Sequence, residues 1–323
     1  MTRTGHRNKA VHQRRALTLL FYCAVGVILT GCSPLVSRFA ARMLERVDAP
    51  IEPVKHRVAH PIRPDVGLSV LWVGHATVLI QIHDKVFITD PVFTKTIGMF
   101  ARRATEPGLD PSSLTRLDYT LISHIHMDHF SYGSLALLPK SGKLLIPFGA
   151  TAYTPEFGFG RTQEMKPWDV LEEDGVRITA VPVRHFSGRY GFDVSWYPDR
   201  GYTGYVIQYN GVTIFFGGDT AYDPQLFKEI GRKFQIDLAL LPIAPIEPRS
   251  FMKRVHADPS DAVQIFEDLR ATFMIPIHYK TFFQGLEPDP LYPQRLLEKI
   301  VEEKGYQDRI KILDFGEQRI LIP

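Results

Sequence analysis

Three imidazoles and a carboxylate lie within six consecutive residues of this 323-residue chain. The segment is His124-Ile125-His126-Met127-Asp128-His129, and it follows the apolar run 119–122 almost directly. Neutral imidazole nitrogens and carboxylate oxygens suit zinc or a similar divalent ion. A polar surface loop rich in histidine is the alternative, but H-x-H-x-D-H is far less common than a chance H-x-H pair. The pattern therefore predicts a metal site.

Three further residues of ligand type stand just after strand-length apolar runs. His185 comes after residues 178–183, Asp219 after residues 213–218, and His278 after residues 273–277. Ligands bind beyond the carboxyl ends of strands in open α/β sheets, so we expect these side chains to converge with the first cluster at one edge of a sheet. A single histidine after a strand is more often an ordinary hydrogen-bonded residue, and it is the combination that favours ligation.

These positions, in this order, resemble the metallo-β-lactamase superfamily, whose pattern is H-x-H-x-D-H, then His, Asp and His. A closer similarity, to N-acylphosphatidylethanolamine-hydrolysing phospholipase D and its bacterial relatives, extends from about residue 71 to the C-terminus. It rests on residues 73–79 (VGHATVL), 89–91 (TDP), 185–189 (HFSGR), 218–220 (GDT), 242–253, 255–263 and 277–282. Tyr279 stands where the phospholipase has Trp, and residues 195–205 also differ, so the acyl and headgroup preference stays open.

The resemblance implies a dinuclear centre with zinc as the expected metal. His124, His126 and His185 would hold the first ion, Asp128, His129 and His278 the second, and Asp219 would bridge them. Two divalent ions roughly 3.5 to 4 Å apart lower the pKa of a bridging water, so a metal-bridging hydroxide would be the nucleophile. Asp128 could also orient that hydroxide as a catalytic residue.

Three other polar residues are candidates for supporting roles. His256 matches a histidine that the phospholipase family has beside the substrate, where it would contact a phosphoryl oxygen or protonate the leaving group; a locally bonded histidine at a helix start is the alternative. His75 and Asp90 are expected to hydrogen-bond to ligand side chains from behind, or else to be ordinary turn residues.

The N-terminal segment has the composition of a secretory signal. Residues 1–31 contain five basic residues and no acidic one, and the apolar run 16–29 is shorter than the roughly 20 residues of a spanning helix. Leu29-Thr30-Gly31-Cys32 resembles a bacterial lipobox. We therefore expect a lipoprotein signal peptide over residues 1–31, a tether and N-terminal arm over 32–60, and a hydrolase domain over 61–323. The mature protein would belong to the bacterial cell envelope, with a lipid anchor at Cys32 on the outer-membrane or periplasmic face. An uncleaved anchor is the alternative.

Charge and cysteine content narrow the function classes. The whole chain carries a net charge of +3, but without residues 1–31 it has 33 basic and 35 acidic residues, a net charge of −2. No basic stripe of the kind that binds nucleic acid is visible. The only cysteines are Cys23 and Cys32, so the expected mature domain has no thiol ligand and its metal site must consist of histidine and carboxylate.

Strand-like and helical segments alternate along the expected domain. Strands are predicted over 70–82, 86–89, 119–122, 143–146, 205–209 and 310–313. Helices are predicted from an N-cap at Ser260 through Asp268, and over 291–304 with an end at Gly305. The pattern fits the α/β (αββα) sandwich of two mixed sheets flanked by helices that the resemblance implies.

The segment 97–103 bears on the substrate. Ile97-Gly98-Met99-Phe100 is apolar and Arg102-Arg103 is cationic. Such a loop could admit acyl chains while the arginines bind lipid phosphate. A loop that packs in the core and has a solvated end fits the same residues equally well. The leading hypothesis is a dizinc phosphodiesterase that cleaves N-acyl-phosphatidylethanolamine or a related glycerophospholipid. The alternatives are a lactonase or other ester hydrolase, and a non-catalytic metal-binding lipoprotein.

The resemblance to the phospholipase family also suggests that the protein forms a homodimer.

Overall fold

The computed structural model describes residues 37–39, 41–42, 47–98, 101–190, 193–194 and 200–323. The predicted signal segment 1–31, Cys32, Met99 and Phe100 lie outside these residues. Within them, no helix has both the length and the apolar character needed to span a bilayer.

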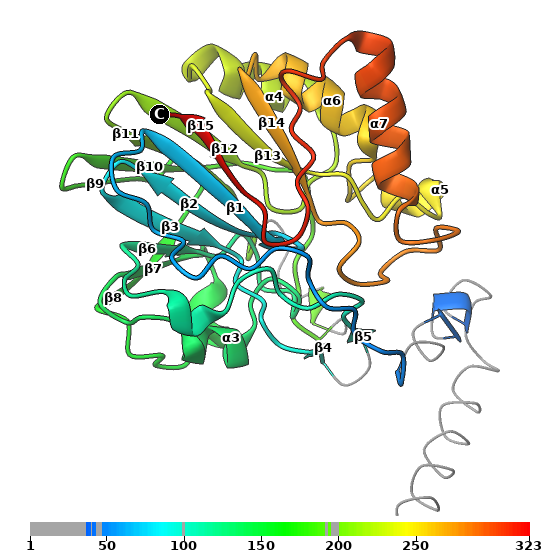
Figure 1. Cartoon of the computed structure of the whole chain (residues 1–323), viewed down its shortest axis with the longest axis horizontal. Coiled ribbons are helices and arrows are strands. Elements are labelled where there is room, and N and C mark those ends of the chain that lie inside the picture. The colour runs from blue at the N-terminus through cyan, green and yellow to red at the C-terminus, as the bar shows by residue number, and fades with distance from the viewer. Residues whose placement is uncertain (1–36, 40, 43–46, 99–100, 191–192, 195–199) are drawn as a thin grey trace, which may run out of the picture.

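Two large mixed sheets form the centre of the molecule (Figure 1). The first has the order β15-β1-β2-β3-β6-β7-β8, with bounds β15 Gln318–Ile322, β1 Leu68–Gly74, β2 Thr77–Ile82, β3 Lys85–Thr89, β6 Tyr119–Leu121, β7 Lys143–Pro147 and β8 Arg161–Met165. The second has the order β14-β13-β12-β11-β10-β9, with bounds β14 Phe273–Ile277, β13 Leu238–Pro242, β12 Val212–Phe216, β11 Gly204–Tyr209, β10 Val176–Val181 and β9 Val170–Glu173. A small hairpin pairs β4 Thr96–Ile97 with β5 Ala101–Arg102.

Helices cover the outer faces of both sheets. The helices α4 Pro224–Lys233, α6 Pro259–Asp268 and α7 Tyr292–Lys304 pack beside the second sheet, with the short α5 Arg249–Met252 near its edge (Figure 1). The helix α3 Tyr132–Leu137 lies against the first sheet, and 3-10 turns occur at Pro111–Ser113 and Ala150–Tyr153. The predicted α/β sandwich of two mixed sheets flanked by helices is thus confirmed.

Strand periodicity explains how the first sheet is buried on both faces. Successive side chains of a strand point to opposite faces. In β1, Leu68, Val70 and Trp72 join the core shared with the second sheet, whereas Leu71 and Val73 join the core on the α3 side. The strand therefore reads as a continuous apolar run, as expected of a strand covered on both faces.

Strand direction brings the candidate residues to one edge. In the first sheet β1, β3 and β6 run the same way, because β1 and β3 are each antiparallel to β2 and β6 is parallel to β3. In the second sheet β10, β12, β13 and β14 also share one direction. The loops that follow β1, β3, β6, β10, β12 and β14 carry nearly all the candidate residues.

Several local predictions can be compared with the structure. The strands over 86–89, 119–122, 143–146 and 205–209 and the helix ended by Gly305 are confirmed. The run 70–82 is two strands, β1 and β2, separated by a turn at residues 75–76. The predicted strand 310–313 is wrong: Ile310 makes only an isolated bridge to Met274, and the last strand is β15.

The predicted N-cap of α6 is also wrong. The cap is Asp258, whose side chain accepts a hydrogen bond from the amide of Asp261, and Pro259 occupies the first turn. Proline is favoured at that position because its missing N–H would be unsatisfied in any case. Ser260 therefore lies inside the helix.

Candidate metal centre

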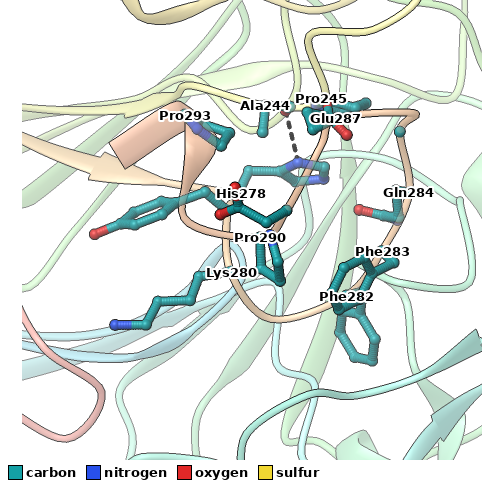
Figure 2. Close-up of a pocket in the computed structure, with 13 residues that line it drawn as sticks. Ala244, Pro245, His278, Lys280, Phe282, Phe283, Gln284, Glu287, Pro290 and Pro293 are labelled. Atoms are coloured by element: carbon teal, nitrogen blue, oxygen red, sulfur yellow. Dashed lines mark hydrogen bonds between the residues drawn. The ribbon is translucent and has the colours of Figure 1, made fainter. Parts of the chain in front are cut away.

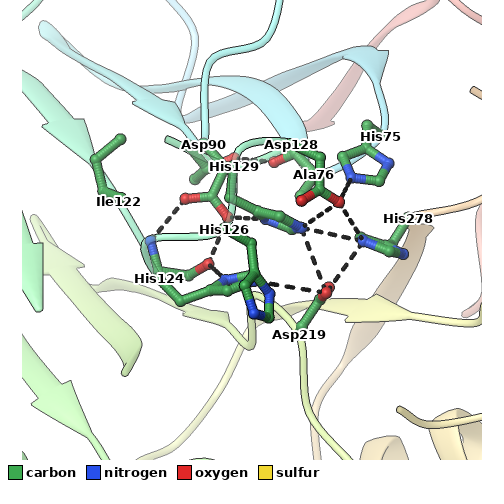
Figure 3. A network of polar contacts seen from close by, with 12 residues as sticks. His75, Ala76, Asp90, Ile122, His124, His126, Asp128, His129, Asp219 and His278 are labelled. Carbon is green, nitrogen blue, oxygen red and sulfur yellow. Dashed lines mark hydrogen bonds and ion pairs between the residues drawn. The ribbon is translucent and has the colours of Figure 1, made fainter. Parts of the chain in front are cut away.

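The carboxylate of Asp219 lies close to several imidazoles, and Figure 3 shows its contacts to His124, His129 and His278. Five nitrogens surround its Oδ2 atom: His278 Nε2 at 3.1 Å, His129 Nε2 at 3.3 Å, His256 Nδ1 at 3.6 Å, His124 Nε2 at 3.8 Å and His185 Nε2 at 4.0 Å. These residues come from loops of both sheets. Imidazole nitrogens grouped around a carboxylate oxygen are the kind of donors that bind a divalent cation.

Backbone and side-chain acceptors orient three of the rings. The Nδ1 atom of His129 donates to Asp90 Oδ2 at 2.6 Å, that of His185 to the carbonyl of Val255 at 2.8 Å, and that of His278 to the carbonyl of Ala244 at 2.9 Å (Figure 2). Each ring then presents its Nε2 atom toward Asp219. Such partners fix the tautomer and orientation of metal-binding histidines.

A hydroxyl orients His124 in the same way. Ser123 gives its one hydroxyl proton to Asp90 Oδ2 at 2.5 Å, so its oxygen accepts from His124 Nδ1 at 2.9 Å. The Nε2 atom of His124 and the Oδ1 atom of Asp219 are buried and have no hydrogen-bond partner in the part of the chain that the structure describes. Two buried acceptors without a donor fit a site made for a cation.

The ligand-type atoms form several overlapping groups. His75, Asp128, His129 and His278 form one group, and His124, His126 and His185 form another; within each, the ligand atoms lie within 4.8 Å of one another. His185, Asp219 and His256 form a third group, and Asp90, His124 and His129 a fourth. The structure thus brings together all seven residues for which ligation was predicted, and His256 with them. The donor set, imidazole and carboxylate only, fits zinc and similar divalent ions.

Burial and charge divide the imidazoles into two kinds. Burial lowers the pKa of both His124 and His185 well below the ordinary value. Burial also acts against protonation of His278, but the charge of Asp219 and the hydrogen bond to Asp128 outweigh it and raise the pKa of His278 to about 9. Burial also acts against protonation of His129, but the negative charges of Asp219, Asp128 and Asp90 outweigh it and raise the pKa of His129.

The two carboxylates at the centre are ionised. Burial alone would raise the pKa of Asp128 and of Asp219, but the neighbouring histidines hold both well below the usual range. Negative charge at this depth needs a compensating cation, and in the metal-free protein protonated imidazoles supply it.

Two further side chains make hydrogen-bond contacts with the carboxylate of Asp128. His75 Nε2 lies 3.0 Å from its Oδ2 atom, and the amide of Gln284 donates to the same oxygen. His75 and Asp90 thus occupy the supporting positions predicted for them. Gln284 was missed by sequence reasoning, because an amide in an irregular loop belongs to no pattern; its place six residues after His278 was the only signal.

A cavity of about 670 Å³ opens onto the centre. His126, Asp128, Asp219, His256 and His278 form its polar floor. Its walls are largely apolar and come from Ile97, Ala101, Phe186, Phe251, Met252 and Phe283, together with the side chains of Phe39, Met127, Arg189, Tyr190 and Gln284. A cavity of this size, with a few polar groups at one end, can enclose a small organic group or part of a lipid.

The prediction for the segment 97–103 is partly wrong. Arg103 is buried, so it is not a solvated end of the loop and its guanidinium does not lie at the protein surface. Its guanidinium donates to the carbonyls of Thr105, Val92 and Thr94 and stacks over Phe282, 5.5 Å from the ring centre. Ile97 does line the cavity, which agrees with the expected apolar loop beside the site.

Comparisons with known proteins agree with this fold and site. Residues 85–279 match the family described as the β-lactamase superfamily domain. The chain is 31% identical over 271 residues to N-acyl-phosphatidylethanolamine-hydrolyzing phospholipase D 1 of Caenorhabditis elegans, which covers 78% of this chain and 75% of that protein. A UPF0173 metal-dependent hydrolase of Thermus thermophilus is 30% identical over 241 residues, covering 73% of this chain and 94% of that protein.

A solved structure shows the same fold. The isothiocyanate hydrolase from Delia radicum gut bacteria superposes with a TM-score of 0.64 at 18% identity, covering 79% of this chain and all of that one. With the family match over residues 85–279 and these relatives, the chain is a metal-dependent hydrolase of the metallo-β-lactamase superfamily, and it belongs among the proteins related to N-acyl-phosphatidylethanolamine-hydrolysing phospholipase D.

Proposed function

We propose that this protein is a phospholipase D-type phosphodiesterase that cleaves N-acyl-phosphatidylethanolamine or a related glycerophospholipid. The observation that carries the proposal is the cavity of about 670 Å³, whose polar floor contains Asp219 and His256 and whose walls are apolar. A phosphodiester has to reach the floor while its acyl chains need the walls. The 31% identity to a protein named for this reaction supports the same substrate class.

Two metal ions, with zinc as the proposed identity, fit the donor set. His124, His126 and His185 would hold one ion, Asp128, His129 and His278 the other, and Asp219 would lie between them. When bound, such a pair lowers the pKa of a water and neutralises charge on phosphoryl oxygens. The side chains contribute rigidity, since outer hydrogen bonds already hold the rings in one orientation.

His256 is the proposed contact to the phosphoryl group. It lines the cavity, and its Nδ1 atom is buried without a hydrogen-bond partner among the described residues. Burial lowers the pKa of His256 to about 4, so the ring is neutral near pH 7 and can donate one hydrogen bond to a substrate oxygen. The negative charge of a phosphodiester would raise that pKa and so favour the protonated ring, which is the form that can give a proton to the leaving group.

The proposal extends to the location of the enzyme. We propose a bacterial lipoprotein anchored through Cys32, with its cavity supplied from the membrane to which it is attached. The apolar cavity wall and the exposed Phe251 and Tyr190 beside it are compatible with lipid delivery. Sedimentation of the full-length protein with membranes, compared with Cys32→Ser, tests the anchor.

The decisive experiment is a mass-spectrometric assay of the full-length, metal-loaded protein on mixed phospholipids that include N-acylated phosphatidylethanolamine. Two metal equivalents are first verified by elemental analysis, and Asp219→Ala is the inactive comparison. Phosphatidic acid formed by the wild type alone supports the proposal. Intact lipids together with lactone or ester hydrolysis would replace it by an ester hydrolase, and inertness toward every class would leave a metal-binding lipoprotein.

A further inference from the structure

A second cavity lies behind the small β4–β5 hairpin. The hairpin pairs Ile97 with Ala101 and Thr96 with Arg102. Ile97 and Ala101 line the cavity at the metal centre, whereas Arg102 lines a separate cavity of about 410 Å³. This division follows from strand geometry, because neighbouring residues of a strand point to opposite faces. The hairpin is therefore a wall shared by two cavities.

Arg103 forms part of the second cavity and is buried, and no carboxylate among the described residues is bonded to it. Its Nε and Nη1 atoms donate to carbonyl oxygens, which fixes the plane of the guanidinium, but its Nη2 atom has no hydrogen-bond partner within the described residues. A buried, unsatisfied donor on a cation costs free energy unless an anion meets it.

Arg102 shows the same deficit next to it. Its Nε atom is buried without a partner among the residues described, and its Nη1 atom makes only a long contact of 3.5 Å to the carbonyl of Val47. Arg102 and Arg103 thus both line one cavity, and each has one donor nitrogen without a partner among the described residues. Two cations that line one cavity repel each other, and an anion in the cavity would lower that repulsion.

The charges around the second cavity leave an excess of positive charge. Its lining includes the cations Arg57, Lys95, Arg102 and Arg103 and the carboxylates Glu106 and Asp110. Glu106 is paired with Arg57, and Asp110 accepts hydrogen bonds from Ser112. Both carboxylates are thus already engaged, and the ammonium of exposed Lys95 has no ion-pair partner in the described part of the chain. The excess of two positive charges matches a phosphate monoester dianion.

We propose that Lys95, Arg102 and Arg103 form a phosphate-binding site behind the hairpin, separate from the metal centre. The ligand is a phosphate group, either free or carried on a lipid headgroup. Arginine N–H groups form charge-assisted hydrogen bonds to phosphate oxygens, and the cavity is large enough for a headgroup. Because Ile97 and Ala101 lie on the other face of the hairpin, an occupied site would also hold that wall of the first cavity in place.

The test is calorimetric titration of the metal-loaded, full-length protein in non-ionic detergent. The probes are inorganic phosphate and a water-soluble short-chain phosphatidic acid. The double variant Lys95→Gln/Arg102→Gln removes two cations that are not buried, and Lys95→Gln alone is the milder second variant. The matched control Arg177→Gln/Lys299→Gln removes the same charge from exposed positions away from the cavity.

We expect the double variant to bind the probe at least about tenfold more weakly than the wild type, because charge-assisted hydrogen bonds to phosphate are about twice as strong as neutral ones. The control keeps wild-type affinity. The titration is repeated in the Asp219→Ala background, where binding at this site persists even though the metal centre is altered. A loss for both probes identifies the phosphate group alone as the ligand, and a loss for the lipid only identifies a headgroup site. Equal affinity in wild type and double variant, or no binding of either probe, overturns the proposal.

Discussion

His129 Nδ1 lies 2.6 Å from Asp90 Oδ2, and neither side chain is exposed to solvent. The same carboxylate accepts the amide of Ser123 at 2.6 Å and the hydroxyl of Ser123 at 2.5 Å. Since Ser123 in turn orients His124, one aspartate fixes two imidazoles of the centre. A carboxylate in this position also raises the basicity of the imidazole that it contacts.

Replacing Asp90 with Asn should weaken metal binding about 10- to 100-fold, the usual effect of removing such a partner. The amide is neutral and cannot accept from His129 and Ser123 on both oxygens. Metal affinity measured by competition with a chromophoric chelator checks this. Asp308→Asn, at an exposed position, is the control. Unchanged affinity in Asp90→Asn would mean that the centre is oriented without this carboxylate.

Metal uptake by the metal-free protein should release protons at pH 7. The pKa of His278 is raised to about 9, so its ring is protonated at pH 7, and the pKa of His129 is raised as well. A metal ion binds only the neutral imidazole, so it must displace these protons. Apparent affinity should therefore increase as the pH rises from 6 toward 9.

Titration calorimetry in buffers of different ionisation enthalpy measures that proton release directly. His124 and His185 should contribute nothing at pH 7, because burial lowers their pKa and they are already neutral. An affinity that stays constant between pH 6 and 9, with no proton release, would contradict the assignment of charge to His278 and His129.

Gly218, which precedes Asp219, should not tolerate a side chain. Its φ is +55°, and a Cβ atom there would lie 2.3 Å from Ser123 Cβ and 2.5 Å from Ser123 Oγ. Gly218→Ala would displace Ser123 and, through it, His124. Gly211→Ala is the matched control, because Gly211 also has a positive φ, +79°, but has open space around it.

Both variants bear the backbone cost of a left-handed alanine, about 1 to 2 kcal/mol. Only Gly218→Ala should lose more stability than this in urea unfolding and bind metal more weakly. Equal losses in the two variants would show that the close packing of Gly218 on Ser123 has no influence on the centre.

His256→Gln should lower the turnover of a phosphodiester substrate by about 10²- to 10⁴-fold, the usual range for a lost acid or base. Its metal content should stay at the wild-type value, since the ring lines the cavity and each proposed metal ion has its ligands without it. Elemental analysis beside steady-state kinetics separates the two effects. A parallel loss of metal and activity would make His256 a ligand.

The order and type of the metal-centre residues can be read from the sequence, because they come after apolar runs that form strands of the two sheets. Segment 119–122 precedes His124, and β14 ends at the residue before His278. The helix that ends at Gly305 is equally local: the residue has φ +67° and terminates α7 in the left-handed conformation that glycine favours.

Long-range contacts decided the rest. Arg103 is buried because its guanidinium donates to the carbonyls of Val92 and Thr94 in the folded protein. The hydrogen bond from Gln284 to Asp128 joins residues that are 156 positions apart in the sequence. The ring nitrogen that each histidine presents likewise depends on acceptors such as Ala244 and Val255, which only the packing of loops brings within reach. Local sequence determines which side chains are available and where strands end, whereas the distances between them arise only when two sheets pack, because neither sheet can bury its apolar face alone.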